Sequence, residues 1–210
     1  MSESRAIDHI VYTVPNLEEA KDQFQQQRGV RPTFGGYQAT QGTKNAIVNL
    51  GDACYLEFLT IDEENHDVPP PHWMGVDLIA TPKITRWSLK SSDLKNDSEV
   101  LRNYNDSMGV VKGGQREMTN GKLLTWEMSM PLAEPEVEII PFLTDWQHSD
   151  THPSEQLPEQ CHLLRIGATH PNPESLYAVL NYFYPELVIT QADRTSLSID
   201  IQTPNGVVQL

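Results

Sequence analysis

The chain repeats one pattern of secondary structure along its length, and this repetition restricts the fold more than any other feature. The first copy has a strand-like run at residues 7–14, a helix, a glycine pair and strands that end at Thr60. A second copy runs from Thr85 to Thr144, and a partial third copy starts at Arg165. One unit of this size cannot bury its apolar face alone, so the copies must pack against one another. The surface between paired copies is the expected place for a ligand cleft.

The order of elements within each copy predicts a mixed α+β fold. Each copy reads as a strand, a helix and then two or three antiparallel strands, so crossover helices combine with hairpins. We expect tandem βαβββ modules that form a curved mixed sheet around a cleft. The expected divisions are a first module at 1–66, a linker at 67–84, a second module at 85–147, a linker at 148–160 and a partial βαββ module at 161–210. All of them are expected to pack as one domain.

Local signals support this order. Asn16 is the expected N-cap of the first helix, with Glu19 completing a capping box and Gly29 ending the helix in the left-handed conformation. The second copy carries the dipeptide Asn120-Gly121, which favours a two-residue hairpin turn. In the third copy Asn172 is the expected N-cap of a helix that starts with proline.

Charge and composition exclude several classes of partner. The 210 residues carry a formal net charge of -14, which argues against nucleic acid and anionic membranes, because both attract basic faces. No apolar run approaches the ~20 residues that span a bilayer, and residues 1–5 lack the apolar segment of a secretory signal. Cys54 and Cys161 are too few for a disulfide framework. We therefore expect a cytoplasmic protein in which both thiols are inert.

An ordered set of short stretches resembles a known superfamily. The chain is similar to the vicinal oxygen chelate superfamily, which includes glyoxalase I and extradiol dioxygenases, and more narrowly to the glyoxalase-like domain family. The resemblance implies that each module curls its sheet into half of a cleft, and that metal-dependent members take ligands from the first and last strands of the modules. The matching stretches lie at residues 7–12, 34–36, 42–46, 55–57, 86–87 and 141–146, followed by His152-Pro153.

The resemblance places a candidate site in the first module. His9 on the first strand and Glu57 on the last strand match the ligand positions of the superfamily, as catalytic residues and as ligands of Zn²⁺, Mn²⁺, Ni²⁺ or Fe²⁺. The alternative is a hydrogen-bonded histidine at a strand end and a glutamate satisfied by an arginine. Strand alternation puts Asp8 on the opposite face, so Asp8 is not expected to orient His9.

The second module does not repeat this ligand pair. Alignment of the copies places Arg86 opposite His9 and Pro141 opposite Glu57, and neither can ligate a cation through its side chain. Arg86 could instead hold a carboxylate or phosphate of the substrate through two parallel hydrogen bonds, or form a structural ion pair. Arg165, which aligns in the third copy, is expected to be structural.

Other residues could complete the cleft. Gln38 stands where the related family has a histidine, and we expect it to bind substrate together with Asn45, which also stabilises the preceding loop. Trp126 and Trp146 are expected to line the cavity, with a core role as the alternative. His152 could bind substrate or be an exposed loop residue. The two glycine pairs are expected to bend the sheet.

Two functions remain open. The first is a glyoxalase-like enzyme with lyase, isomerase or dioxygenase chemistry on an oxygen-bearing small molecule that carries an anionic substituent. In it Glu57 would be a ligand or general base, and a metal would polarise a carbonyl. The second is a binding protein of the bleomycin-resistance type, which uses the same cleft without metal or catalysis. Because the modules are fused in one chain, a monomer suffices for the cleft, and a homodimer stays open.

Overall fold

The computed structural model describes residues 4–117, 122–146 and 148–210. We call three sets of elements the first, second and third repeat. The first repeat comprises β1 (Ile7–Thr13), α1 (Leu17–Arg28), β2 (Thr33–Gln38), β3 (Thr43–Asn49) and β4 (Tyr55–Ile61). The second comprises β5 (Lys83–Lys90), α2 (Leu94–Tyr104), β6 (Val111–Glu117), β7 (Leu123–Ser129) and β8 (Phe142–Asp145). The third comprises β9 (His162–His170), α3 (Tyr177–Phe183), β10 (Val188–Gln191), β11 (Ser196–Thr203) and β12 (Gly206–Gln209).

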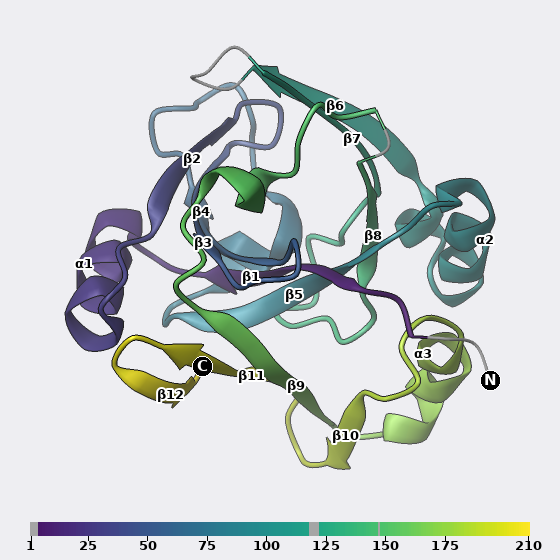
Figure 1. The fold of residues 1–210 in the computed structure, drawn as a ribbon. Helices are drawn as coiled ribbons and strands as arrows, with labels where there is room; N and C mark the ends of the chain where they lie inside the picture. Colours follow the sequence, from purple (N-terminus) through teal and green to yellow (C-terminus); the bar gives the residue numbers. More distant parts are fainter. Residues whose placement is uncertain (1–3, 118–121, 147) are drawn as a thin grey trace.

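The first two repeats share one curled sheet of eight strands. Its order is β2-β3-β4-β1-β5-β8-β7-β6, so the two repeats run outward in opposite directions from the β1–β5 junction. β1 and β5 pair antiparallel, whereas β1 pairs parallel with β4 and β5 parallel with β8. The edge strands β2 and β6 curve toward the same side, which gives the sheet a concave face (Figure 1). The predicted α+β fold of curved sheet modules is confirmed.

The convex face of this sheet is covered by helices and by the third repeat. α1 packs on β3 and β4, α2 packs on the strands of the second repeat, and β11 packs on β5 between them (Figure 1). The third repeat forms its own sheet in the order β10-β9-β11-β12. Apolar side chains from all three repeats join one large core on this side. The third repeat therefore stabilises the convex side and leaves the concave side free.

Most of the local signals are confirmed. Asn16 Oδ1 accepts a hydrogen bond from the Glu19 amide at 3.1 Å, and Gly29 ends α1 with a φ of 80°. The prediction for the third helix is wrong in part, because the Asn172 side chain makes no capping bond and the chain forms a 3₁₀ turn, η4 (Pro173–Leu176), before α3. The predicted Asn120-Gly121 turn lies outside the described residues.

The segments between the repeats contain short 3₁₀ helices with buried side chains. They are η1 (Trp73–Leu78) and η3 (Pro153–Gln156), and a further turn, η2 (Asp106–Gly109), follows α2. Met74 in η1 and Ser154 in η3 are each 1% exposed. η1 packs against β4 and β5, and η3 packs against β3. Both lie on the concave side of the sheet and form part of the structure around the cleft. Among the described residues, no helix has the length and apolar character needed to cross a membrane.

Candidate active site

The concave face holds one cavity of about 360 Å³ between the first and second repeats. This volume lies at the small end of the range for ligand pockets. Of the eight predicted site residues, His9, Gln38, Asn45, Glu57, Trp126 and Trp146 line the cavity, whereas Arg86 and His152 do not. The other lining residues are Tyr37, Ala39, Thr40, Gln41, Ile47, Tyr55, Trp73, Met74, Lys112, Gly113, Gly114, Gln115, Leu124, Met128, Met130 and Pro153.

A β-bulge in β1 brings two consecutive side chains together at the floor of the cavity. Ile7 pairs with Leu89 and His9 pairs with Ser88, so two steps along β1 correspond to one step along β5. The extra residue is Asp8, and a bulge of this kind breaks strand alternation. Asp8 Oδ1 consequently lies 2.5 Å from His9 Nδ1. The prediction that Asp8 faces away from His9 is therefore wrong.

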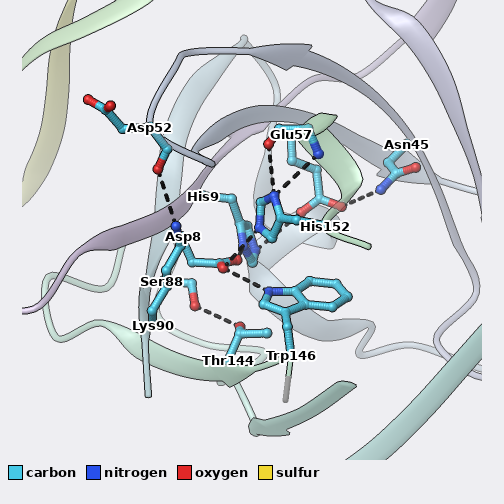
Figure 2. Close-up of polar contacts among 11 residues, drawn as sticks. Asp8, His9, Asn45, Asp52, Glu57, Ser88, Lys90, Thr144, Trp146 and His152 are labelled. Atoms are coloured by element: carbon cyan, nitrogen blue, oxygen red, sulfur yellow. Dashed lines mark hydrogen bonds and ion pairs between the residues drawn. The ribbon is translucent and has the colours of Figure 1, made fainter. Parts of the chain in front are cut away.

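Asp8 is a buried carboxylate that organises several side chains. It is fully buried, and its Oδ2 accepts hydrogen bonds from Trp146 Nε1 at 2.8 Å and from His152 Nε2 at 3.3 Å (Figure 2). Burial acts to raise the pKa of Asp8, but the hydrogen bonds and charges of His152 and His9 outweigh it and lower the pKa below its usual value. Asp8 is therefore ionised at neutral pH.

His9 is held so that its Nδ1 is hydrogen-bonded to Asp8 and its Nε2 faces Glu57 in the cavity. Because ionised Asp8 accepts hydrogen bonds only, His9 Nδ1 carries a proton. The imidazole stacks on Tyr55 with ring centroids 4.7 Å apart and meets the edge of Phe142 at 5.1 Å, which fixes its plane. Its Nε2 then lies 3.9 Å from Glu57 Oε2 (Figure 2). These two atoms are too far apart for a direct hydrogen bond, so both can act on a ligand.

Glu57 is fixed from its other side by Asn45. The Asn45 amide Nδ2 donates a hydrogen bond to Glu57 Oε1, which leaves Oε2 directed toward His9. Asn45 can approach because the strand beside it carries glycine, since a Cβ on Gly35 would lie 2.3 Å from Asn45 Oδ1. A register shift between Phe34 and Gly36 accompanies this contact. The first glycine pair thus both interrupts the strand register and makes room for Asn45.

The strand registers show which polar side chains of the second repeat are arranged on their strands as His9 and Glu57 are in the first. In the first repeat the β4 partner of His9 lies two residues before Glu57. In the second repeat the β8 partner of Ser88 lies two residues before Thr144. His9 pairs with Ser88 and Val11 pairs with Arg86 across the β1–β5 junction, as expected of a pseudo-twofold axis that relates His9 to Arg86. The sequence alignment, which places Arg86 opposite His9, therefore agrees with the strand pairing.

Ser88 and Thr144 form a closed pair. Their hydroxyl oxygens lie 2.8 Å apart, and both residues are fully buried (Figure 2). Each hydroxyl is satisfied by the other, so this pair offers little to a ligand. The second repeat thus supplies no counterpart of the His9 and Glu57 side chains.

The second repeat contributes apolar surface to the cavity instead. Gly36 pairs with Asn45 in the first repeat, and Gly114 pairs with Trp126 in the second, so Asn45 and Trp126 occupy corresponding positions. A Cβ on Gly114 would lie 2.6 Å from two atoms of the Trp126 ring, so glycine allows the indole to lie across β6. Trp126 meets the ring of Trp146 at a centroid distance of 5.7 Å and an interplanar angle of 52°.

Arg86 has a structural position. It is 1% exposed, and its two terminal nitrogens donate to carbonyl oxygens in the loop between β7 and β8, those of Leu132, Pro135 and Glu136, and to its own neighbour Thr85. Burial lowers the pKa of Arg86 to about 10, so it remains charged at neutral pH. With these bonds made, Arg86 is not placed to bind an anionic substituent. We therefore correct the expected substrate-binding role to support of this loop.

The remaining predicted residues divide between the cavity wall and its support. Gln38 lines the cavity, and its Oε1 accepts a hydrogen bond from Thr43 Oγ1 at 3.2 Å. His152 is buried behind the cavity between Asp8 and Ser154, so it positions Asp8 instead of contacting a ligand. Arg165 pairs with Asp200 on the exposed face of the third repeat, as expected of a structural residue.

Several lining residues escape prediction from the sequence. Trp73 and Met74 come from the segment after the triple proline, which reads as a connector. Trp73 Nε1 donates to Thr43 Oγ1 at 3.2 Å, and Met74 adopts a left-handed φ of 57°. A tryptophan-methionine pair in a polar connector is the signal that could have indicated a buried position.

The donors present do not suit a firmly held metal ion. Divalent ions in proteins are usually held by three or four side-chain ligands. Within the described ranges, no group of three or more His, Cys, Asp and Glu side chains is arranged to hold one. His9 and Glu57 provide two donors, and the Ser88 and Thr144 hydroxyls of the second repeat bond to each other. The divalent ion that the resemblance implies is therefore not matched by this set of residues.

Comparisons with known proteins agree with the fold. A search of curated proteins gives no match. The solved structure of a hypothetical protein from Staphylococcus aureus is similar over 97% of this chain and 84% of that chain, with 14% identity and a TM-score of 0.62.

Two methylmalonyl-CoA epimerase structures are more distant. One, in complex with methylmalonyl-CoA and NH4+, is 16% identical over 71% of this chain and 99% of its own, with a TM-score of 0.43. The enzyme from Mycobacterium tuberculosis is 16% identical over 69% and 90%, with a TM-score of 0.42. Similarity at this level does not bear on the reaction. The profile of the glyoxalase-like domain family matches residues 7–182, which is most of the sequence. The chain therefore belongs to the glyoxalase-like domain family.

Proposed function

We propose that the protein is a small-molecule enzyme that moves a proton between carbon and oxygen atoms of a carbonyl compound, as an isomerase or lyase. The observation that carries this proposal is the pair formed by His9 Nε2 and Glu57 Oε2, 3.9 Å apart in the wall of the cavity. Both groups can hold and release a proton, and each has a buried partner that fixes its orientation.

Glu57 acts as the general base. With Oε1 held by Asn45, Oε2 is free to remove the proton from a carbon next to the substrate carbonyl. The electron pair of the broken C–H bond moves to the carbonyl oxygen, which becomes an enolate. When His9 takes the proton of an adjacent hydroxyl, return of the proton from Glu57 to the former carbonyl carbon gives an isomer; expulsion of a leaving group with its electron pair from the carbon next to the enolate double bond gives a lyase product.

His9 acts on the oxygen. In its protonated form, Nε2–H donates to the carbonyl oxygen and transfers a proton as the enolate forms. Asp8 holds Nδ1–H and stabilises the imidazolium, as a carboxylate does for a catalytic histidine in other enzymes. Dioxygenase chemistry needs a metal centre with more protein donors than His9 and Glu57 provide, so the proposal is confined to proton transfer.

Proton exchange with deuterium oxide tests the proposal without knowledge of the natural substrate. Purified protein is incubated with α-hydroxyacetophenone or hydroxyacetone, and loss of the signal of the proton beside the carbonyl is followed by NMR. We expect exchange that depends on both side chains, so that Glu57→Gln and His9→Gln abolish it while Thr144→Val retains it. Equal exchange in wild type and Glu57→Gln, or no exchange above the buffer rate, contradicts the proposal. Binding without exchange would indicate a binding protein.

A further inference from the structure

We propose that the substrate is an uncharged carbonyl compound that bears one aromatic or similarly planar ring. The ring occupies the side of the cavity built by the second repeat. The inference rests on the proposed function for the position of the carbonyl, beside His9 and Glu57. Three properties of the cavity carry it: the surface that the second repeat and Trp146 contribute, the charges around the cavity and its volume.

The surface that the second repeat and Trp146 contribute to the cavity is largely apolar and partly aromatic. Trp126 and Trp146 present two rings tilted by 52°, and Met128 and Met130 lie beside them in the lining. Trp126 is half-buried, in contrast to Trp87, which is fully buried in the core. Tilted aromatic rings and methionine sulfur favour contact with a planar ring of a ligand. The close contact of the Trp126 ring with Gly114 fixes the position of the ring before a ligand binds.

The charges around the cavity disfavour an anionic substrate. Glu57 is the acidic side chain in the lining, and the ionised carboxylate of Asp8 lies directly behind His9. Among the described lining residues, Lys112 is the one lysine or arginine, and it is an exposed residue of the edge strand β6. Arg86, which could have held a phosphate or carboxylate, is bonded to the loop between β7 and β8. In the described lining a phosphate group would therefore meet the Glu57 carboxylate, with the Asp8 carboxylate behind His9, and no arginine.

The volume limits the size of the substrate. A cavity of about 150 Å³ holds a benzene ring. The present cavity of about 360 Å³ has room for such a ring with a short oxygen-bearing chain. With the ring of the ligand beside Trp126, the carbonyl on the short chain of the ligand would lie close to His9 and Glu57.

Binding to three matched probes tests the inference. α-Hydroxyacetophenone, hydroxyacetone and dihydroxyacetone phosphate share a hydroxyketone and differ in an added ring or phosphate. Calorimetry is performed on His9→Gln, in which no turnover is expected and the carboxylate of Glu57 is retained. We expect α-hydroxyacetophenone to bind at least about tenfold more tightly than hydroxyacetone, and dihydroxyacetone phosphate to bind most weakly. Equal affinity for the first two, tightest binding of the phosphate, or no binding of α-hydroxyacetophenone overturns the inference.

Substitutions of Trp126 test whether its ring causes the tighter binding of α-hydroxyacetophenone. Trp126→Leu should remove the advantage of α-hydroxyacetophenone, and Trp126→Phe should keep most of it. The matched control, Tyr177→Leu, removes an exposed aromatic residue of α3 and should change nothing. Retention of the full advantage by a folded Trp126→Leu protein overturns the assignment.

This test and the exchange test can fail separately. If the probes bind in the expected order but Glu57→Gln exchanges as fast as wild type, the ligand class stands and the proposed function fails. If exchange depends on Glu57 but hydroxyacetone binds as tightly as the aromatic probe, the proposed function stands and the ligand class fails.

Discussion

The first and second repeats have the same arrangement of strands, yet they present different chemistry to the cavity. His9 and Glu57 lie on β1 and β4 of the first repeat, and Ser88 and Thr144 lie on β5 and β8 of the second. The second pair is closed by a 2.8 Å hydrogen bond, whereas the first is open, with 3.9 Å between Nε2 and Oε2. A buried polar pair that satisfies itself contributes to stability, and one that does not can act on a ligand. Under the proposed function, the first repeat supplies the acid–base pair and the second supplies binding surface.

A third position extends the comparison. Asn45 in the first repeat and Trp126 in the second each lie beside a strand glycine that makes room for the side chain. The glycine beside each side chain is the same, but Asn45 holds the carboxylate of Glu57 whereas Trp126 provides a ring surface. The cavity is therefore divided into a reactive side and an apolar side by the identity of a few side chains.

The largest difference is expected between substitutions of Glu57 in the first repeat and Thr144 in the second. Glu57→Gln should lower the rate of proton exchange by about 10²–10⁴-fold, because a general base is lost while the bond to Asn45 can persist. Thr144→Val removes a buried hydroxyl from the closed pair and should cost about 1 kcal/mol of stability without such a loss in rate. NMR exchange rates and urea unfolding of both variants make the comparison. Similar losses of exchange rate in Glu57→Gln and Thr144→Val would contradict an acid–base role confined to the first repeat.

The two arginines that the repeat pattern aligns should differ in stability. Arg86→Met leaves several buried carbonyl oxygens without a donor and should lower the free energy of unfolding by about 2–4 kcal/mol. Arg165→Met removes an exposed pair with Asp200 and should cost less than about 1 kcal/mol. Urea unfolding measures both. An Arg86→Met protein of wild-type stability would contradict the structural role.

Asp8 should affect the rate through His9. In Asp8→Asn, the side chain can no longer stabilise the imidazolium or reliably fix the Nδ1–H tautomer, so exchange should fall by about 10–100-fold. The affinity for α-hydroxyacetophenone should change little, because Asp8 does not line the cavity. A loss of affinity that accounts for the whole rate effect would instead mean that Asp8 holds the cavity together.

Asp8 should also make part of the free energy of unfolding depend on pH. Its pKa is lowered in the folded protein relative to the unfolded value of about 3.9, so it binds fewer protons when folded. The stabilisation is present above pH about 4 and is lost as the pH falls toward the folded value. Urea unfolding between neutral and acidic pH should show a shallower decline for Asp8→Asn than for wild type. Parallel curves would contradict the lowered pKa.

The smallest effect is expected from chelation. Because the described residues supply two donors at the site, dialysis against EDTA should change the exchange rate by less than about twofold. NMR exchange before and after dialysis checks this. A large loss that one divalent ion restores would show that the first repeat acts through a metal.

The sequence predicts the repeats and six of the cavity-lining residues, because these follow from local pattern and from the family resemblance. It does not predict the Asp8 contact, since a bulge in β1 depends on the register with β5. It also assigns Arg86 the wrong role, because the carbonyl oxygens that bind its guanidinium lie in the loop between β7 and β8, about 50 residues away in sequence. Trp73 and Met74 lie in the cavity lining only because a distant segment folds over the sheet.

The structure of Glu57→Gln bound to α-hydroxyacetophenone tests the division between the repeats most directly. The account predicts that the carbonyl oxygen lies within hydrogen-bond distance of His9 Nε2 and that the phenyl ring lies against Trp126. A ligand with its ring on His9 and its carbonyl toward Trp126, or one bound outside the cavity, would contradict it.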